Sequence, residues 1–226
     1  MRGLMKSIRE LDISRYKFII FDLDGTLIDS AGVWDEIDQK TIAHFCGVIE
    51  DLSTINKNRE WFLTNNPKGH IYFNYSAWLK EKYNIAETPE QILRMRWDMG
   101  CEWYKTCDYK NDAENVIKLL KESGLTLSIA TSGVREQVDN AQFKNAIIMA
   151  KADFSKYFDL ILTQEDVENK KPHPEFYLTV IDYFKANPSE CLVFEDHLNG
   201  VKSAKKAGIE VVNVYCKHSP TMIEMN

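Results

Sequence analysis

The sequence has no apolar run long enough to cross a bilayer, and residues 1–17 lack the apolar core of a signal peptide. It also has no excess of basic residues, because 28 Lys and Arg stand against 34 Asp and Glu and give a net charge of -6. Without a basic surface a protein has no general attraction for nucleic acid or for an anionic membrane. We therefore expect a cytoplasmic protein that binds neither, and the composition leaves open whether it is a monomer or a homodimer.

Cysteine is sparse as well, and the five cysteines include no C-x-x-C pair. An odd number of unclustered cysteines is not typical of a disulfide scaffold or of a thiolate zinc site, and it favours reduced thiols. Internal repeats and low-complexity linkers are also absent. What remains is a 226-residue chain with 44% hydrophobic residues, enough for one large or two small domains with a full core.

Short apolar segments alternate with helical ones over much of the chain. The predicted strands cover residues 17–21, 125–130, 158–162, 191–194 and 210–214. Helical stretches at 113–123 and 201–207 precede two of these strands, and each ends at a glycine. Strand and helix alternation of this kind predicts an α/β fold, a Rossmann-like parallel sheet covered by helices.

The alternation breaks between about residues 31 and 109, where the pattern is helical and no convincing strand occurs. We therefore predict a core domain made of residues 1–30 and 110–226, with residues 31–109 inserted as a helical cap domain. All five tryptophans lie in this insert. We expect its aromatic residues to build the core of the insert and its contact with the sheet domain, rather than a platform for substrate.

The acidic and the basic residues of the insert lead to different expectations. Three acids on a predicted helix, Asp35, Glu36 and Asp38, are expected to form its solvated face. Five basic residues are expected mostly at the surface, although any of them could reach the distal part of a substrate: Arg59, Lys68, His70, Arg94 and Arg96.

Two carboxylates directly follow the first predicted strand. Side chains two residues apart in an extended segment point the same way, so Asp22 and Asp24 should face one spot. Like charges at one spot are unfavourable unless a cation lies between them or one of them is protonated. This pair therefore predicts a metal-assisted site.

Further polar residues follow the other predicted strands, at the sheet edge where α/β proteins bind ligands. They are Thr131-Ser132-Gly133, the segment Lys170–Pro174, whose two prolines restrict the loop and can hold the neighbouring lysine in place, and Glu195-Asp196. Oxygen ligands suit Mg²⁺, and backbone N–H groups at a strand-to-helix turn can bind phosphate. One aspartate could then attack phosphorus while another exchanges protons with the leaving alcohol and with water.

Four motifs occur in a fixed order between Phe18 and about Val214: D-x-D-G-T, A-T-S-G, K-P-x-P and F-E-D-x-x-x-G. Together they resemble the four signatures of the haloacid dehalogenase-like hydrolase superfamily. The helical insert between the first two motifs is similar to the first cap type of that superfamily. That cap occurs in its phosphoglycolate phosphatase and β-phosphoglucomutase group.

The resemblance implies roles for single residues. Asp22 would be the nucleophile that becomes an aspartyl-phosphate, and Asp24 would be the general acid and base. Lys171 would stabilise the charge on Asp22 and on the phosphate. Thr131 would hydrogen-bond the phosphoryl oxygens. Ser132 and Gly133, which follow it in the turn, are further candidates for phosphate binding, although Ser132 could instead cap the next helix.

The resemblance also implies a Mg²⁺ site and a reaction class. Asp22 and Asp196 would bind the ion with their carboxylates, Asp24 with its backbone carbonyl, and Glu195 directly or through water. Dehalogenases and phosphonatase-like members lack an aspartate at position 24. Its presence here therefore favours a phosphate ester as substrate.

The sequence is compatible with three functions. The leading prediction is a Mg²⁺-dependent phosphatase that hydrolyses a small phosphorylated metabolite. A β-phosphoglucomutase-like phosphomutase would use the same core residues, but the G-x-x-R sequence of that group is absent. The third alternative is a binding or regulatory protein built on an intact hydrolase core.

Overall fold

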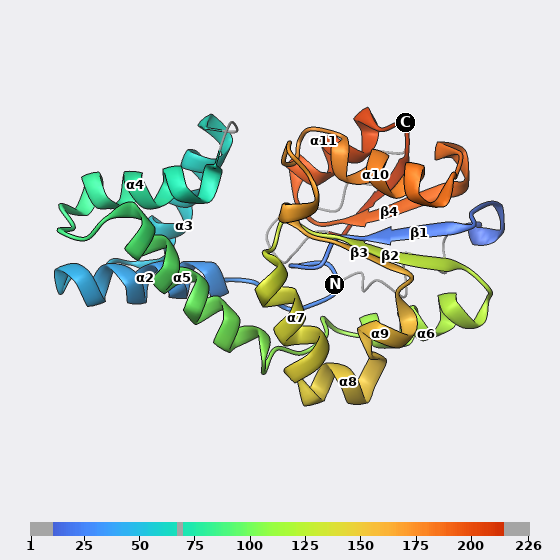
Figure 1. Cartoon of the computed structure of the whole chain (residues 1–226), viewed down its shortest axis with the longest axis horizontal. Helices are drawn as coiled ribbons and strands as arrows, with labels where there is room; N and C mark the ends of the chain where they lie inside the picture. Colours follow the sequence, from blue (N-terminus) through green and yellow to red (C-terminus); the bar gives the residue numbers. More distant parts are fainter. Residues whose placement is uncertain (1–10, 67–69, 215–226) are drawn as a thin grey trace. The chain divides into compact units, whose positions relative to one another are not determined.

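A parallel sheet of five strands forms the centre of the fold (Figure 1), in a computed structural model that describes residues 11–66 and 70–214. The strand order is β3-β2-β1-β4-β5. The strands are β1 (Phe18–Phe21), β2 (Thr126–Ala130), β3 (Leu160–Leu162), β4 (Cys191–Glu195) and β5 (Glu210–Asn213). All five predicted strands are present, with ends that differ by up to two residues, and the predicted α/β fold is confirmed.

Helices cover both faces of the sheet. Helices α10 (Glu175–Phe184) and α11 (Leu198–Lys206) lie on one face, and α6 (Ala113–Glu122), α7 (Arg135–Lys144), α8 (Ala146–Ala152) and α9 (Phe154–Tyr157) lie on the other (Figure 1). Short 3₁₀ turns complete this part of the chain at η1 (Ile13–Arg15), η2 (Gln164–Asp166) and η3 (Pro188–Glu190). Because both faces are covered, the central strand is apolar throughout, and Ile19, Ile20 and Phe21 are fully buried.

The register of the strands brings their carboxyl ends to one level. Phe21, the last residue of β1, pairs with Ile129 of β2 and with Phe194 of β4. The residues that follow these three positions therefore emerge together at one edge of the sheet, with β1 in the middle.

The chain divides into two compact units. The core unit consists of Met1–Asp29 and Lys105–Asn226 and contains the sheet, and the helical unit consists of Ser30–Tyr104. Four helices make up the helical unit: α2 (Val33–Cys46), α3 (Leu52–Asn65), α4 (Ile71–Tyr83) and α5 (Pro89–Tyr104). No strand occurs among the described residues of the helical unit.

The helical unit has its own apolar core. Its buried members come from all four helices and the loop after α4, and they are Ile42, Ile55, Phe62, Tyr75, Leu79, Ile85 and Ile92. Phe62 and Tyr75 pack against the ring of Trp78, as expected for aromatic residues that build a core. Trp61 departs from the expectation, because it is 57% exposed.

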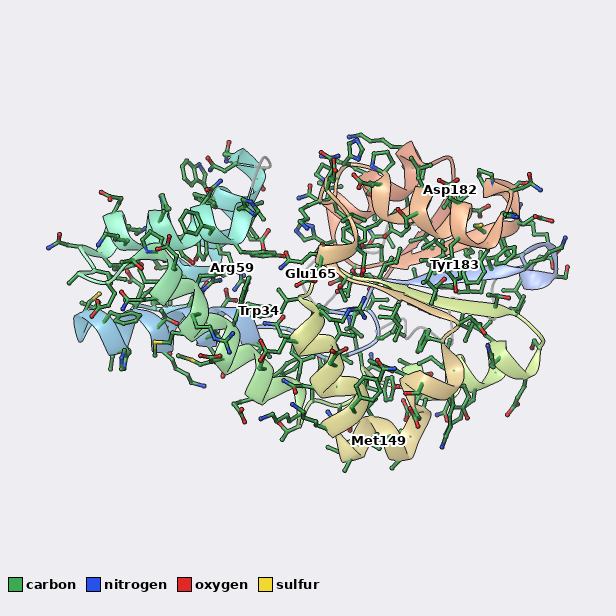
Figure 2. All side chains as sticks on the ribbon, viewed as in Figure 1. Trp34, Arg59, Met149, Glu165, Asp182 and Tyr183 are labelled. Atoms are coloured by element: carbon green, nitrogen blue, oxygen red, sulfur yellow. The ribbon has the colours of Figure 1, made fainter. Side chains whose placement is uncertain are left out.

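The expectation that the acids of α2 form a solvated face is wrong for Asp35 and Asp38, which are buried. The Nε of Arg96 lies 2.7 Å from the Oδ1 of Asp38, and the Nη1 of Arg59 (Figure 2) lies 2.8 Å from the Oδ1 of Asp35. The hydroxyl of Tyr75 donates a further hydrogen bond to Asp38, at 3.0 Å. A helical pattern identifies a polar face, but it does not show that α3 and α5 supply arginines to that face.

Three more of the residues expected at the surface are found there. Glu36, the third acid of α2, is exposed, as are His70 and Arg94. Lys68 lies outside the described residues. Arg96 is only 3% exposed, so the expectation of a surface position is wrong for this arginine. Within the described ranges, no helix has both the length and the apolar composition needed to span a membrane.

Candidate active site

Two of the motif residues extend the hydrogen-bond ladder of the sheet just beyond its strands. The N–H of Asp22 donates to the carbonyl of Phe194 at 2.9 Å, and the N–H of Thr131 donates to the carbonyl of Leu162 at 3.0 Å. The backbone of both residues is therefore as fixed as that of the strands. Asp22 and Thr131 thus begin at the same sheet edge, in agreement with the expectation from the parallel order.

The ammonium group of Lys171, in the third motif, contacts a residue of each of the other three motifs. Its Nζ donates to Asp22 Oδ1 at 2.7 Å, to Glu195 Oε1 at 2.6 Å and to the carbonyl of Ala130 at 2.9 Å. An ammonium has three donors, so these bonds use all of them. The Lys171 side chain is only 6% exposed. Water is therefore largely excluded, and the charge of Lys171 acts on Asp22 and Glu195 with little screening.

Glu195 is held from a second direction. The hydroxyl of Tyr177, a fully buried residue of α10, donates to Glu195 Oε1 at 3.1 Å. The other carboxylate oxygen, Oε2, accepts the N–H of His197 at 3.0 Å. His197 in turn caps α11, because its Nδ1 accepts the N–H of Asn199 at 3.2 Å. The histidine that follows the predicted metal ligand therefore has a structural task at the start of this helix.

Three carboxylates from two strand ends form a possible metal site. Asp22, Glu195 and Asp196 each offer one oxygen atom, and these atoms lie within 4.8 Å of one another. An all-oxygen set of carboxylates is the ligand type that Mg²⁺ prefers. The donor set therefore fits this ion.

Two glycines leave room for these carboxylates. A Cβ atom built on Gly25 would lie 2.0 Å from Asp196 Oδ2, and one built on Gly200 would lie 1.7 Å from Glu195 Oε1. Any larger residue at either position would collide with the acids. Gly25 also has a φ of +76°, which a residue with a side chain rarely adopts. The glycines of the first and fourth motifs are thus explained by close packing against the site.

The loop after the first strand folds back on itself. Asp24 forms a bridge with Ile28, and the N–H of Gly25 donates to the carbonyl of Ile28 at 3.0 Å. The hydroxyl of Thr26 donates to Asp196 Oδ1 at 3.5 Å. This tight turn ties the loop that carries Asp24 to the carboxylate pair of the fourth motif.

The turn after β2 has the geometry of a strand-to-helix connection. Thr131 is 1% exposed, and its hydroxyl accepts the N–H of Gly133 at 3.0 Å. Ser132 and Gly133 are half-buried, and α7 begins two residues later at Arg135. The carbonyl of Ala130, directly before Thr131, accepts a hydrogen bond from Lys171. This bond places the second motif beside the ammonium group that contacts Asp22.

The carboxylates carry more negative charge than the site balances. Burial raises the pKa of Asp22 well above its ordinary value, and although Lys171 opposes this, Glu195 and Asp196 add to it. Burial, with Glu195, also raises the pKa of Asp196 to about 7. For Lys171, burial opposes the charge, but Asp22 and Glu195 prevail and raise its pKa well above the ordinary value. Such a site favours an additional positive charge.

Two residues of this region are not marked by any sequence motif. Tyr177 holds Glu195, and Lys110 donates from its Nζ to the backbone carbonyl of Gly25. The apolar pattern of α10 accounts for a tyrosine in the core without revealing what its hydroxyl contacts. Lys110 follows the helical insert and belongs to none of the four motifs, so no sequence signal marked it.

Comparisons with known proteins place the chain in a family. Residues 19–214 match the family model described as haloacid dehalogenase-like hydrolase. The phosphorylated carbohydrates phosphatase of Thermotoga maritima is 36% identical, over 85% of this chain and 82% of the relative. The protein CbbY of Rhodobacter capsulatus is 38% identical, over 87% and 84% of the two chains.

A solved structure shows the same fold. The crystal structure of CbbY from Rhodobacter sphaeroides in complex with xylulose-(1,5)bisphosphate matches with a TM-score of 0.72 at 21% identity, covering 89% of this chain and 87% of that one. All four motifs lie within the matched range, and the predicted superfamily and enzyme class are confirmed. This chain belongs to the haloacid dehalogenase-like hydrolase family.

Proposed function

We propose that the protein is a Mg²⁺-dependent phosphatase that hydrolyses a small phosphorylated metabolite through an aspartyl-phosphate on Asp22. The observation that carries the proposal is the ammonium of Lys171, which lies 2.7 Å from Asp22 and 2.6 Å from Glu195 within a cluster that also includes Asp196. A cation next to a buried carboxylate at a strand end suits a nucleophile that must accept a doubly charged phosphoryl group.

In the first half of the reaction a carboxylate oxygen of Asp22 forms a bond to phosphorus. The bond between phosphorus and the ester oxygen breaks, and Asp24 gives its proton to the departing alcohol. Lys171 offsets the negative charge of Asp22 and of the incoming phosphate. Thr131, Ser132 and Gly133, at the turn after β2, bind the phosphoryl oxygens.

In the second half a water molecule attacks the phosphorus of the aspartyl-phosphate. Asp24, now ionised, takes a proton from this water as the new bond forms. The bond between Asp22 and phosphorus breaks, inorganic phosphate leaves, and both aspartates return to their starting forms. Asp24 thus acts first as an acid and then as a base.

Four residues would hold Mg²⁺: Asp22 and Asp196 through carboxylates, Asp24 through its backbone carbonyl, and Glu195 directly or through water. When bound, the ion would neutralise charge on the phosphoryl oxygens and on the surrounding acids. We further propose that the helical unit acts as a cap that selects the substrate. The name of the Thermotoga relative favours a phosphorylated carbohydrate as the class to test first.

A panel of phosphorylated metabolites with free phosphate as the readout tests this proposal. We expect release of phosphate from at least one sugar phosphate in the presence of Mg²⁺, and none with Asp22→Asn or with excess chelator. Lys205→Met, an exposed residue of α11, is the control and should retain activity. Full activity of the Asp22→Asn variant would reject the mechanism, and an isomeric sugar phosphate formed without free phosphate would identify a phosphomutase.

A further inference from the structure

The segment just after the helical unit runs alongside the loop that carries Asp24. The N–H of Lys110 donates to the carbonyl of Leu27 at 2.8 Å, and the N–H of Asp29 donates to the carbonyl of Asp108 at 3.2 Å. Between these bonds, Ile28 and Tyr109 form an antiparallel bridge. The backbone of Lys110 is therefore held in place beside this loop.

From this fixed backbone the side chain of Lys110 reaches the glycine that packs against Asp196. Its Nζ donates to the carbonyl of Gly25, the glycine packed so closely against Asp196 that a Cβ would lie 2.0 Å from the carboxylate. Lys110 is half-buried, so its charge is only partly screened by water. A second ammonium group is thus near the cluster, on the side of Asp196.

Lys171 and Lys110 act on different acids of the cluster. Lys171 uses its three donors on Asp22, Glu195 and the carbonyl of Ala130, so none is left for Asp196. The charge of Lys110 lowers the pKa of Asp196, against the larger and opposite effects of burial and of Glu195. Lys110 therefore acts electrostatically on the one member of the cluster that Lys171 does not bind.

We propose that Lys110 is an internal counter-ion of Asp196 that competes with Mg²⁺ for this carboxylate and thereby sets the affinity of the site for divalent cations. The inference rests on the proposed metal dependence and adds a residue that controls it. Without metal, the ammonium compensates part of the negative charge and keeps the loop after β1 ordered. With metal, the same ammonium faces a divalent cation, and their repulsion weakens binding.

A purely structural role for Lys110 predicts the opposite sign. If the lysine only fastened the carbonyl of Gly25, its removal would loosen the loop and weaken metal binding. A counter-ion that competes with the metal predicts tighter binding once the charge is removed. The direction of the change in Mg²⁺ affinity therefore separates the two roles.

The test is a calorimetric titration of the full-length protein with MgCl₂, which needs no substrate and no turnover. We expect Lys110→Met and Lys110→Gln to bind Mg²⁺ about tenfold more tightly than wild type, because a unit charge near a divalent ion in a half-buried site has an effect of at least this order. Lys110→Arg keeps the charge, and Lys205→Met removes the same charge from an exposed position of α11. Both controls should bind as wild type does.

The outcomes are distinct for the two proposals. Equal or weaker Mg²⁺ binding by Lys110→Met and Lys110→Gln overturns the counter-ion role while leaving the proposed phosphatase intact. Absence of Mg²⁺ binding by the wild type rejects the metal dependence, and the counter-ion role with it. If Lys110→Met does not fold, the comparison of Lys110→Gln with Lys110→Arg decides the question.

Discussion

Buried charges form a cluster in each unit of this protein, and the two clusters differ in their balance. In the helical unit, Asp35 pairs with Arg59 and Asp38 pairs with Arg96. The hydroxyl of Tyr75 also donates a hydrogen bond to Asp38. In the core unit, three carboxylates gather within 4.8 Å, and the single buried lysine among them bonds two. In the helical unit the buried charges cancel, whereas the acidic excess of the core unit calls for a cation from outside the buried set.

The consequence of removing a charge should therefore differ in sign between the clusters. Taking one acid from the balanced set leaves a buried guanidinium without its partner, which is strongly unfavourable. Taking one acid from the acidic set relieves repulsion when no metal is bound.

Asp38→Asn should destabilise the protein by about 3–5 kcal/mol, because Arg96 then carries an uncompensated charge in a buried site. Urea unfolding at neutral pH measures this change. Glu36→Gln, on the same helix, is the matched control. It removes the same charge from an exposed ion pair, in which Oε2 of Glu36 lies 3.6 Å from Nζ of Lys40. It should change the free energy of unfolding by less than about 0.5 kcal/mol. Similar losses for both variants would show that the buried pair has no special role.

Asp196→Asn should have a smaller effect of opposite sign in metal-free protein, and this effect should depend on pH. The pKa of Asp196 is raised from 3.8 to about 7, so the folded state holds this proton more tightly than the unfolded chain does. Ionisation therefore costs wild type stability as the pH rises from about 4 to 7, and the cost levels off above pH 7. Asn cannot ionise, so the variant escapes this cost.

Unfolding of both metal-free proteins at pH 5 and at pH 8 isolates the contribution of Asp196. We expect wild type to lose stability relative to Asp196→Asn between these two values. A difference that stays constant, or that grows in favour of wild type, would contradict the acidic excess.

Gly200→Ala should give the smallest change, and its direction is informative. Alanine in place of a helical glycine ordinarily stabilises a protein by about 0.5–1 kcal/mol. Here the new Cβ would lie 1.7 Å from Glu195, so Glu195 must move and the variant should lose about 1–3 kcal/mol together with Mg²⁺ affinity. Lys202→Ala, exposed on the same helix, controls for helix propensity. A gain of stability in Gly200→Ala would show that this close contact does not constrain the site.

The sequence predicted the acidic cluster better than the balanced one, for a physical reason. Asp22, Thr131 and Glu195 lie at the ends of strands in short contiguous motifs, and parallel strands bring their carboxyl ends to one edge. Arg96 lies 58 residues from Asp38 on another helix. No local pattern links two such positions, so the helical pattern alone predicts a solvent-exposed aspartate at position 38.

Lys110 and Trp61 also show that contacts between distant segments cannot be predicted from the local sequence. The position of Lys110 depends on pairing between residues 27–29 and 108–110, which neither segment reveals alone. Trp61 was expected in a core because of its type, but it is 57% exposed on α3. Residue type and periodicity predict elements and contiguous motifs, whereas contacts between distant segments come from tertiary packing.

The most direct measurement is the melting temperature of wild type and Asp196→Asn as Mg²⁺ is added. An ion that binds only the folded protein stabilises it by about 2.7 kcal/mol at a concentration one hundred times its dissociation constant. We predict a saturable rise in the melting temperature of wild type and little or no rise for Asp196→Asn. No rise in wild type, or an equal rise in both proteins, would contradict a divalent-cation site formed by Asp22, Glu195 and Asp196.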